Sequence, residues 1–390
     1  MIFSKRTLKT RTLQTFLHTT VAVVLSALFL TSCAGPGNHV DNISHAGHNS
    51  VMLSPSLLTY GTVPPQVPIV PPQVPIPKIP MQKVIHAIKE LSAGRGFIVH
   101  IYTTWAEYPS VLPALNTEIK QYALAGFTVS LTLRYMPPLG HNGDIQGFVN
   151  YVQNMVAALA HQPAVKFLQI TNEPNSSVNP AASDGAYQNV LSALVLGIEA
   201  AHVEQIKVGS HAALGFNWFY SFGVQSDKAW WKSLGQLGGL NFVKDVDWIG
   251  VDLYPGTYVP LTFPSPKSPK FVDVAKADVA NALGYVRTKL MPLAGFGANV
   301  PMGISEIGWA TSPPTRSFAT QARLVTAFSQ SACSVAQKDN LVFLQWFNLA
   351  DNFTPLVQSP LKMGIMKADL CPKPAFYAYQ SVVRHGCPIS

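Results

Sequence analysis

Two glutamates stand in short polar motifs, each directly after an apolar run. Glu173 lies in the segment TNEPN (171–175), and Glu306 lies in ISEIGW (304–309). Neither has a basic residue beside it in the sequence. A pair of carboxyl groups can cleave a glycosidic bond, because one protonates the leaving oxygen while the other attacks the anomeric carbon or activates water. Carboxyl groups about 5–5.5 Å apart give retention of configuration, and a wider gap gives inversion.

The segments that must position these glutamates alternate regularly along the chain. Apolar runs typical of buried strands cover 97–102, 127–133, 165–170, 246–253, 301–305 and 341–347, and a further strand starts at 206–208 and runs toward His211. Helical faces lie between them, at 84–91, 148–159, 187–201, 279–290 and 320–333. Strands that alternate with helices indicate a parallel sheet covered by helices. Roughly 290 residues of this pattern predict an α/β fold, the (β/α)8 TIM barrel, which typically takes about 250 residues.

An eighth strand is needed before the first helix, and 57–60 is the only candidate. A repeat follows it, because VPPQVPI occurs at 63–69 and again at 70–76. Proline at this density favours an extended polyproline conformation. If 57–60 is strand one, the repeat belongs to the first strand-to-helix loop; otherwise it is a spacer. The segment 55–80 therefore stays open between these two alternatives, ahead of a catalytic barrel at 81–390.

In this barrel the carboxyl ends of the strands form the active-site face. The two glutamates end the fourth and seventh strands of the eight-strand count, so they should face each other across the mouth. The other strand ends carry polar or aromatic groups where a core would use Val, Ile or Leu: Trp105, Arg134, Asn172, His211, Asp252, Tyr254 and Trp346.

The motifs resemble those of the clan A retaining glycoside hydrolases, a group that includes cellulases and endoglycanases. The NEP of 172–174 matches the group's Asn-Glu-Pro, which implies that Glu173 is the acid/base and that Asn172 contacts the sugar 2-hydroxyl. SEIGW (305–309) resembles the strand that carries the nucleophile, which implies that role for Glu306. Tyr254 matches a tyrosine that hydrogen-bonds the nucleophile, and Trp346 matches a tryptophan that floors the subsite beside the cleavage point. The resemblance covers about 97 to 351.

Two positions depart from this pattern, and the identity of the sugar stays open. Many members place an arginine at the end of strand two, whereas Arg134 ends the third strand; many have a histidine two residues before the tyrosine, where this chain has Asp252. We predict substrate contacts for Arg134, Asp252, His211 and Trp309. The alternatives are a salt bridge at the rim for Arg134, a hydrogen-bonded strand-end side chain for His211, and packing under loops for Trp309.

The two glutamates also have structural alternatives. Asn172 and the following proline suit the start of a helix, where a carboxylate such as Glu173 is favourable, and Glu306 could belong to a structural ion pair. If both are catalytic, Glu173 starts protonated and Glu306 starts ionised. Two close carboxyl groups raise one pKa, and a hydrogen bond from Tyr254 would keep the pKa of Glu306 low.

Other classes of function leave different signatures. A metal-dependent barrel hydrolase needs His-x-His or a cluster of histidines and aspartates at the strand ends, and the sequence has neither. It also lacks the Gly-x-Ser-x-Gly, P-loop and His-Glu-x-x-His motifs. We therefore predict no cofactor and no metal. The alternative to an enzyme is a non-catalytic carbohydrate-binding surface lipoprotein on the same barrel, which need not keep both carboxylates.

Composition agrees with a large folded domain. Of 390 residues, 48% are apolar and 12% are charged, which supports a sizeable core and argues against disorder. The net charge of +8 is concentrated at the start, where Lys5, Arg6, Lys9 and Arg11 precede the first acid, Asp41. Removing those four positive charges lowers the net charge from +8 to +4 and leaves no basic run, so no nucleic-acid partner is expected.

Residues 1–33 predict a lipoprotein signal peptide: basic residues, an apolar stretch at 21–30, then LTSC at 30–33. The stretch is short for a membrane-spanning helix, which needs about 20 residues. LTSC resembles the bacterial lipobox, in which the cysteine, here Cys33, is lipidated; an ordinary signal peptide is the alternative. Residues 34–54 predict a flexible tether. We expect an exported monomer that acts on carbohydrate and is either lipid-anchored to a bacterial cell envelope or secreted.

Three further cysteines follow, at 333, 371 and 387. An exported protein permits one disulfide among them. We prefer Cys371–Cys387, which would pin the C-terminal tail and leave one thiol over.

Overall fold

The computed structural model describes residues 58–65, 79–221, 225–258, 264–312, 316–351 and 362–387. The predicted signal peptide, Cys33 and the tether at 34–54 lie outside the described residues, as does most of the proline repeat. Among the residues described, no helix is both long and apolar enough to cross a membrane.

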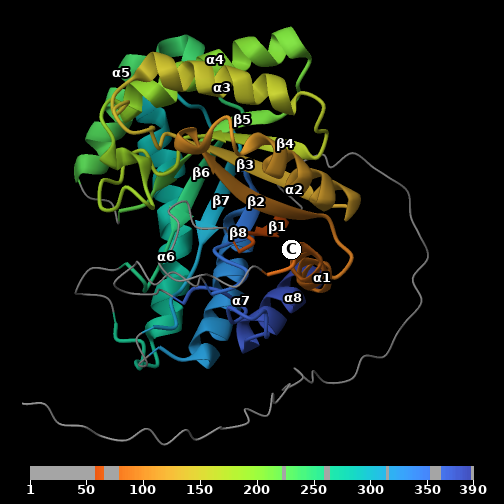
Figure 1. The fold of residues 1–390 in the computed structure, drawn as a ribbon. Coiled ribbons are helices and arrows are strands. Elements are labelled where there is room, and N and C mark those ends of the chain that lie inside the picture. Colours follow the sequence, from red (N-terminus) through yellow and green to blue (C-terminus); the bar gives the residue numbers. More distant parts are fainter. Residues whose placement is uncertain are drawn as a thin grey trace, which may run out of the picture. The chain divides into compact units, whose positions relative to one another are not determined.

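The described chain closes into a barrel of eight parallel strands in sequence order, with the last strand pairing with the first (Figure 1). This confirms the prediction of a (β/α)8 TIM barrel. The strands are β1 (Thr59–Thr62), β2 (Phe97–Thr104), β3 (Thr128–Arg134), β4 (Val165–Ile170), β5 (Ala213–Phe219), β6 (Trp248–Leu253), β7 (Met302–Ile307) and β8 (Leu341–Trp346).

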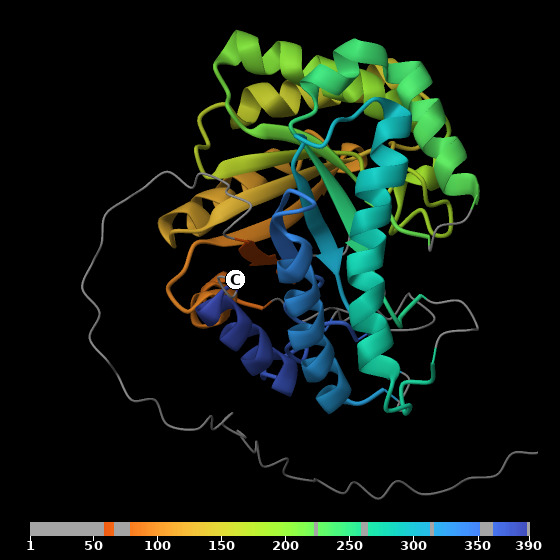
Figure 2. The same ribbon diagram turned by 180° about the vertical axis from the view of Figure 1, so that it is seen from behind.

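Helices cover the outside of the barrel, and their apolar faces pack on the outer faces of the strands. Figure 2 shows the last two helices, α7 and α8, side by side. They are α1 (Met81–Ser92), α2 (Leu112–Leu124), α3 (Ile145–Leu159), α4 (Val190–Val208), α5 (Gln225–Asp245), α6 (Phe271–Tyr285), α7 (Phe318–Val335) and α8 (Pro374–His385).

Helices α2, α5 and α8 had no counterpart in the predicted pattern. In α2 only Leu115, Ile119 and Tyr122 are buried, so the apolar face is narrow. In α5 the helical pattern is broken at Gly239, whose φ of 60° lies in the left-handed region. A weak or interrupted 3.6-residue period gives little signal in the sequence.

The first strand is short and is defined by its neighbours. β1 pairs with β2 through Tyr60 to Thr62 and with β8 through all four of its residues. Gly61 is required at this closure, because a side chain there would overlap the backbone and side chain of Ile98. Four residues with a central glycine have little intrinsic strand preference, so the sequence signal at 57–60 was faint.

The strand predicted from 206 toward His211 was wrong. Residues 206–208 complete α4, which ends at Gly209 with a left-handed φ of 69°. Ile206 is 72% exposed on the outer side of that helix, so its β-branched side chain marks no buried strand. β5 begins only at Ala213. His211 is therefore an exposed residue at the start of β5, at the end of the barrel opposite the mouth.

An aromatic layer fills the lower part of the barrel. Phe167, Trp248 and Phe343 come from non-adjacent strands, yet their ring centroids lie 5.2–5.9 Å apart, so they meet in the interior. Ile98 belongs to the same buried cluster, so the layer takes one side chain from each even-numbered strand. Gly303 leaves room for it, because a Cβ there would overlap the Phe343 ring.

A polar layer lies above this aromatic layer, closer to the mouth of the barrel. His100, two residues along β2 from Ile98, contacts Gln345 Oε1 through Nδ1 at 2.5 Å and Thr132 Oγ1 through Nε2 at 2.7 Å. Alternate residues of a strand face the same side. On each of these strands, the next inward-facing side chain therefore lies closer to the mouth of the barrel. Burial lowers the pKa of His100 to about 4, so the ring is neutral at ordinary pH.

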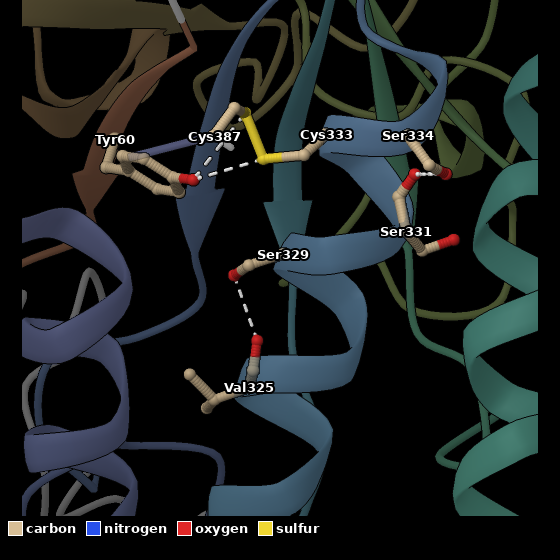
Figure 3. The surroundings of a disulfide bond; sticks show 7 residues. All are labelled: Tyr60, Val325, Ser329, Ser331, Cys333, Ser334 and Cys387. Carbon is tan, nitrogen blue, oxygen red and sulfur yellow. Dashed lines mark hydrogen bonds between the residues drawn. A yellow bond between two sulfur atoms is a disulfide. The ribbon is translucent and has the colours of Figure 1, made fainter. Parts of the chain in front are cut away.

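A disulfide joins Cys333 of α7 to Cys387, just after α8 (Figure 3). The preferred pairing Cys371–Cys387 was therefore wrong. Cys333 was the less obvious partner because it is separated from Cys387 by 54 residues and only the packing of α7 against α8 brings the two together. The Tyr60 hydroxyl lies 3.5 Å from Cys333 Sγ (Figure 3).

Candidate active site

The end of β4 carries Glu173 in a strained backbone. Thr171 and Glu173 have φ angles of 65° and 46°, in the left-handed region that residues with a Cβ rarely adopt. The Glu173 amide donates to Asn217 Oδ1 at 2.7 Å, which fixes this conformation from β5. Such strain persists only where surrounding contacts over-determine the backbone, and it gathers at functional sites.

Asp184 organises the loop that follows. Its carboxylate accepts hydrogen bonds from the backbone amides of Asn172 and Tyr135, both at 2.7 Å, and forms a buried salt bridge with Arg134 at 2.8 Å. Arg134 also donates to the carbonyl of Ala181 at 2.7 Å. The guanidinium is thus engaged within the protein, as in the salt-bridge alternative, although the pair is buried rather than at the rim.

The end of β7 carries Glu306 next to an irregularity in strand pairing. Val251 and Asp252 of β6 are consecutive, but their partners on β7, Ile304 and Glu306, are separated by Ser305. An extra residue of this kind re-aims the side chains around it. Because of the extra residue, two consecutive side chains of β7 both point into the barrel. Ser305 contacts Asp252, and Glu306 faces the mouth.

Two tyrosines hold Glu306. Tyr254, which follows β6, donates its hydroxyl to Glu306 Oε2, as predicted for this residue. Tyr102 of β2 donates to Glu306 Oε1. Burial raises the pKa of Glu306, and these two hydrogen bonds oppose that rise by stabilising the carboxylate.

Glu173 and Glu306 lie close together. One carboxyl oxygen from each, together with one from Asp252, falls within 4.8 Å of the others. All three residues are buried. Carboxyl oxygens this close agree with the spacing of about 5–5.5 Å in retaining enzymes rather than with the wider gap of inverting ones.

The proton is placed on Glu173. Burial, and then the negative charge of Glu306, raise the pKa of Glu173 to about 8. The Ser183 hydroxyl donates to Glu173 Oε2 and opposes this rise. Glu173 is thus neutral at pH 7 and can donate a proton, as a general acid must.

Asp252 lies beneath the pair rather than facing it openly. Its Oδ1 accepts from Ser305 Oγ and its Oδ2 from Asn217 Nδ2, both at 2.5 Å. Burial, and then the charges of Glu306 and Glu173, raise its pKa well above the ordinary value. Because both oxygens are engaged by protein donors, the prediction that Asp252 contacts substrate gains no support from the geometry.

Asn172 is held in a similar way. Its Nδ2 donates to the carbonyl of Ala182 at 2.8 Å, and its Oδ1 accepts from Asn217 Nδ2 at 2.8 Å. Asn217 therefore connects the end of β4 with Asp252 of β6.

Five of the six carboxyl oxygens in the cluster accept a hydrogen bond from Tyr102, Tyr254, Ser183, Ser305 or Asn217. Among the described residues, Glu173 Oε1 has no hydrogen-bond partner. The three carboxyl groups could geometrically hold a cation, but five of their six oxygens already accept a hydrogen bond. The arrangement suits proton transfer through Glu173 Oε1.

Two predicted substrate contacts face away from the mouth. Trp346 is buried against Phe328 of α7, with its Nε1 donating to the Met363 carbonyl at 3.2 Å, and is not a subsite floor. Trp309 is buried beside Phe271 of α6, with Arg316 over its ring at 5.4 Å, as in the packing alternative. His211 lies at the opposite end of the barrel, so it is not a substrate contact.

Aromatic side chains do border the glutamates. Phe219, Tyr258 and Phe347 all pack on Tyr254, with ring centroids 6.3, 5.4 and 6.1 Å away. Tyr258 is 43% exposed. Burial, and then the charges of Glu173 and Glu306, raise its pKa to about 12, which places it in their electrostatic field.

Several site residues were absent from the sequence prediction, among them Tyr102, Ser183, Asp184 and Asn217. The run FIVHIYTT has polar or aromatic residues at His100 and Tyr102, a period of two that signals an interior strand face. Asn217 is the single polar residue of ALGFNWF. It was missed because the fifth strand was predicted too early, from 206. Ser183 lies in a loop and gives no signal.

Comparisons with known proteins find similarity in structure only. No protein-family model matches the chain, and no curated protein does either. A family 1 β-glucosidase from Thermotoga maritima matches with a TM-score of 0.56 and 15% identity, over 78% of this chain and 86% of that one. An exo-β-1,4-mannosidase from Opitutaceae bacterium strain TAV5 matches with a TM-score of 0.57 and 14% identity, over 84% and 59%.

A family 39 glycoside hydrolase from Bacteroides cellulosilyticus WH2 matches with a TM-score of 0.54 and 16% identity, over 84% of this chain and 64% of that one. At such low identity the likeness concerns the fold. The chain has the (β/α)8 barrel fold found in glycoside hydrolases of families 1 and 39, and the resemblance predicted from its motifs is confirmed at that level.

Proposed function

We propose that this protein is a retaining O-glycosyl hydrolase that cleaves a poly- or oligosaccharide by double displacement. The observation that carries the proposal is the buried pair Glu173 and Glu306 at the ends of β4 and β7, with carboxyl oxygens within 4.8 Å of each other. The donors around the pair separate two roles, because Glu306 accepts two phenol hydrogen bonds while Glu173 holds the proton.

In the first step, Glu306 attacks the anomeric carbon. The bond from that carbon to the leaving oxygen breaks, and the oxygen takes the proton of Glu173 Oε1. An ester between the sugar and Glu306 forms, and Glu173 is left as a carboxylate. With the charge of Glu306 removed, the ionised form of Glu173 becomes easier to hold in the buried site.

In the second step, Glu173 acts as a base. It takes a proton from water, and the water oxygen bonds to the anomeric carbon. The ester bond breaks, its electron pair returns to Glu306 as a carboxylate, and both groups regain their starting states. Configuration at the anomeric carbon is retained after two inversions.

The aromatic edge of Phe219, Tyr258 and Phe347 supports a sugar as the substrate. These rings lie beside the nucleophile through Tyr254 and offer apolar surface to the faces of a pyranose ring. β-Glucosides and β-mannosides are the first compounds to test, since structural neighbours include a β-glucosidase and a β-mannosidase. Export and lipid anchoring at Cys33 remain part of the proposal, on the evidence of the N-terminal sequence alone.

The test is a panel of aryl β-glycosides and oligosaccharides with the wild type, Glu173→Ala and Glu306→Ala. Each variant should lose at least about a thousandfold in kcat on unactivated substrates, since each removes one half of the chemistry. Azide should partly rescue Glu306→Ala by forming a glycosyl azide of inverted configuration, and NMR of the product reads that configuration. Glu204→Ala is the matched control, because Glu204 is a buried glutamate of α4 whose partner is the exposed Lys207.

Full activity in both catalytic variants would refute the assignment. Tight binding of an oligosaccharide by a wild type that cleaves nothing in the panel would instead favour the non-catalytic carbohydrate-binding protein. Those two results are separated by measuring binding calorimetrically on the same preparations.

A further inference from the structure

The β2 strand brings an unexpected side chain to the nucleophile. Tyr102 donates its hydroxyl to Glu306 Oε1, while Tyr254 donates to Oε2. Each oxygen of this buried carboxylate therefore meets a phenol from a different part of the barrel, Tyr102 from β2 and Tyr254 from the end of β6. Tyr254 was predicted for this role, and Tyr102 was not.

Tyr102 is held from below. Its ring stacks on the imidazole of His100, with centroids 4.5 Å apart and planes 18° from parallel. His100 is itself fixed at both ring nitrogens by Gln345 of β8 and Thr132 of β3. The polar layer of the barrel thus supports a preorganised hydrogen-bond donor, which is the arrangement that transition-state stabilisation requires.

Within the described residues, no lysine or arginine donates a hydrogen bond to Glu306. Arg134, the cation whose charge reaches it, is bound to Asp184 and to loop carbonyls. Neutral phenols therefore carry the direct stabilisation of the carboxylate. Both hydrogen bonds lower the pKa of Glu306 against the opposing effect of burial.

We propose that Tyr102 is a second catalytic tyrosine, which donates to the Glu306 carboxylate in the resting enzyme and again when that carboxylate re-forms as the glycosyl–enzyme ester breaks. The inference rests on the proposed function and deepens it. In the second step the electron pair of the breaking bond returns to Glu306, so a fixed donor at Oε1 stabilises the charge as it develops.

Tyr102→Phe removes one oxygen and keeps the stacked ring. The Glu306 carboxylate then loses a charge-assisted donor, so its pKa rises. Because the nucleophile must be ionised, the acid limb of the pH profile of kcat/KM should move up by about one pH unit. With a substrate whose ester breakdown is rate-limiting, kcat should fall about tenfold, because the second step loses a charge-assisted donor. Tyr254→Phe should act in the same direction, and the double variant should exceed either single one.

A second variant should shift the acid limb in the opposite direction. Site-specific replacement of Tyr102 by 3-fluorotyrosine keeps the packing and makes the phenol a stronger acid and donor. The acid limb should then move down rather than up. Tyr151→Phe is the matched control, since Tyr151 is a buried tyrosine of α3 whose ring packs on Tyr108 and Phe148; it should leave the limb where it is.

Carboxyl-¹³C-glutamate NMR gives a readout that does not need activity. The Glu306 resonance is assigned by its disappearance in Glu306→Gln, and its titration is followed in the wild type and in both Tyr102 variants. Opposite shifts of that titration in the phenylalanine and fluorotyrosine variants would support the role of Tyr102. An unchanged titration and an unchanged acid limb in both would overturn it. A wild type that hydrolyses no glycoside but shows the opposite shifts would refute the proposed function while keeping the Tyr102–Glu306 interaction.

Discussion

At the scale of single residues, the division of labour between the two glutamates follows from their hydrogen-bond donors. Both are buried at the same mouth, and burial raises both pKa values. Glu306 meets two phenol hydroxyls, whereas Glu173 meets the single hydroxyl of Ser183. The charge therefore rests preferentially on Glu306, and its presence raises the pKa of Glu173 further.

The Glu173 proton sets the upper pH limit of activity. Because Glu173 must be protonated to start the reaction, kcat/KM should fall as pH rises through about 8. Ser183→Ala removes a donor that stabilises the ionised form, so the pKa of Glu173 should rise and the alkaline limb should move to higher pH by about half a unit. The pH profile with an aryl glycoside measures both values as properties of the coupled pair.

Ser329→Ala serves as the control, because Ser329 donates within α7, on the outside of the barrel, to the Val325 carbonyl (Figure 3). An alkaline limb that moves to lower pH in Ser183→Ala would contradict the direction of the Ser183 effect.

At the scale of elements, the loop after β4 is fastened to two strands by one buried ion pair. Asp184 accepts from both strand-end amides and from Arg134, while Arg134 also holds the loop carbonyls. Since the same loop supplies Ser183 to Glu173, the pair positions the acid without touching the substrate.

Arg134→Met should be strongly destabilising, because it leaves the Asp184 carboxylate buried without its cation. We expect a loss of about 3 kcal/mol in the free energy of unfolding, measured by urea denaturation. Lys207→Met removes an exposed partner of Glu204 and should cost less than about 1 kcal/mol. Equal losses in the two variants would show that the Arg134 pair is no more than a surface contact.

Strands and helices with a strong period were predictable from the sequence alone. The run at 165–170 matches β4 residue for residue, and the face at 148–159 lies within α3. Segments whose structure depends on neighbours were not: 206–208 looks like the start of a strand and is the end of a helix. The predicted orientation of Trp346 was wrong for a related reason: the β8 side chain that faces the barrel interior here is Gln345, and Trp346 faces outward.

At the scale of the whole molecule, the closure of the barrel is secured by the C-terminal helix. The Tyr379 hydroxyl of α8 donates to the Gly61 carbonyl of β1 at 2.7 Å and lies 3.2 Å from the Leu344 carbonyl of β8. The disulfide between Cys333 and Cys387 fastens the same region, beside Tyr60 (Figure 3). The first strand, the last strand and α8 thus meet at one seam of the barrel.

Replacing both Cys333 and Cys387 by serine should lower the free energy of unfolding by about 2–4 kcal/mol, since the bridge restricts the unfolded chain. The kcat should stay unchanged at 25 °C, because α7 ends near the start of β8, at the end of the barrel opposite the glutamates. Thermal unfolding and kinetics on the same double variant check both statements. A large fall in kcat without a change in stability would contradict this placement.

The sequence by itself determined the barrel and the two glutamates. Apolar periodicity is a local property of the chain, and Glu173 and Glu306 each directly follow a strand signal, so both could be placed at strand ends and paired. Tyr254 was found in the same way.

Only the tertiary structure decided what surrounds them. Tyr102, Ser183 and Asn217 come from three different segments, and their hydrogen bonds depend on which face of each strand or loop turns inward. The extra residue in β7 and the left-handed backbone after β4 set those directions, and neither leaves a period in the sequence. Long-range pairing likewise chose Cys333 over Cys371, because the packing of α7 on α8 sets which sulfurs meet.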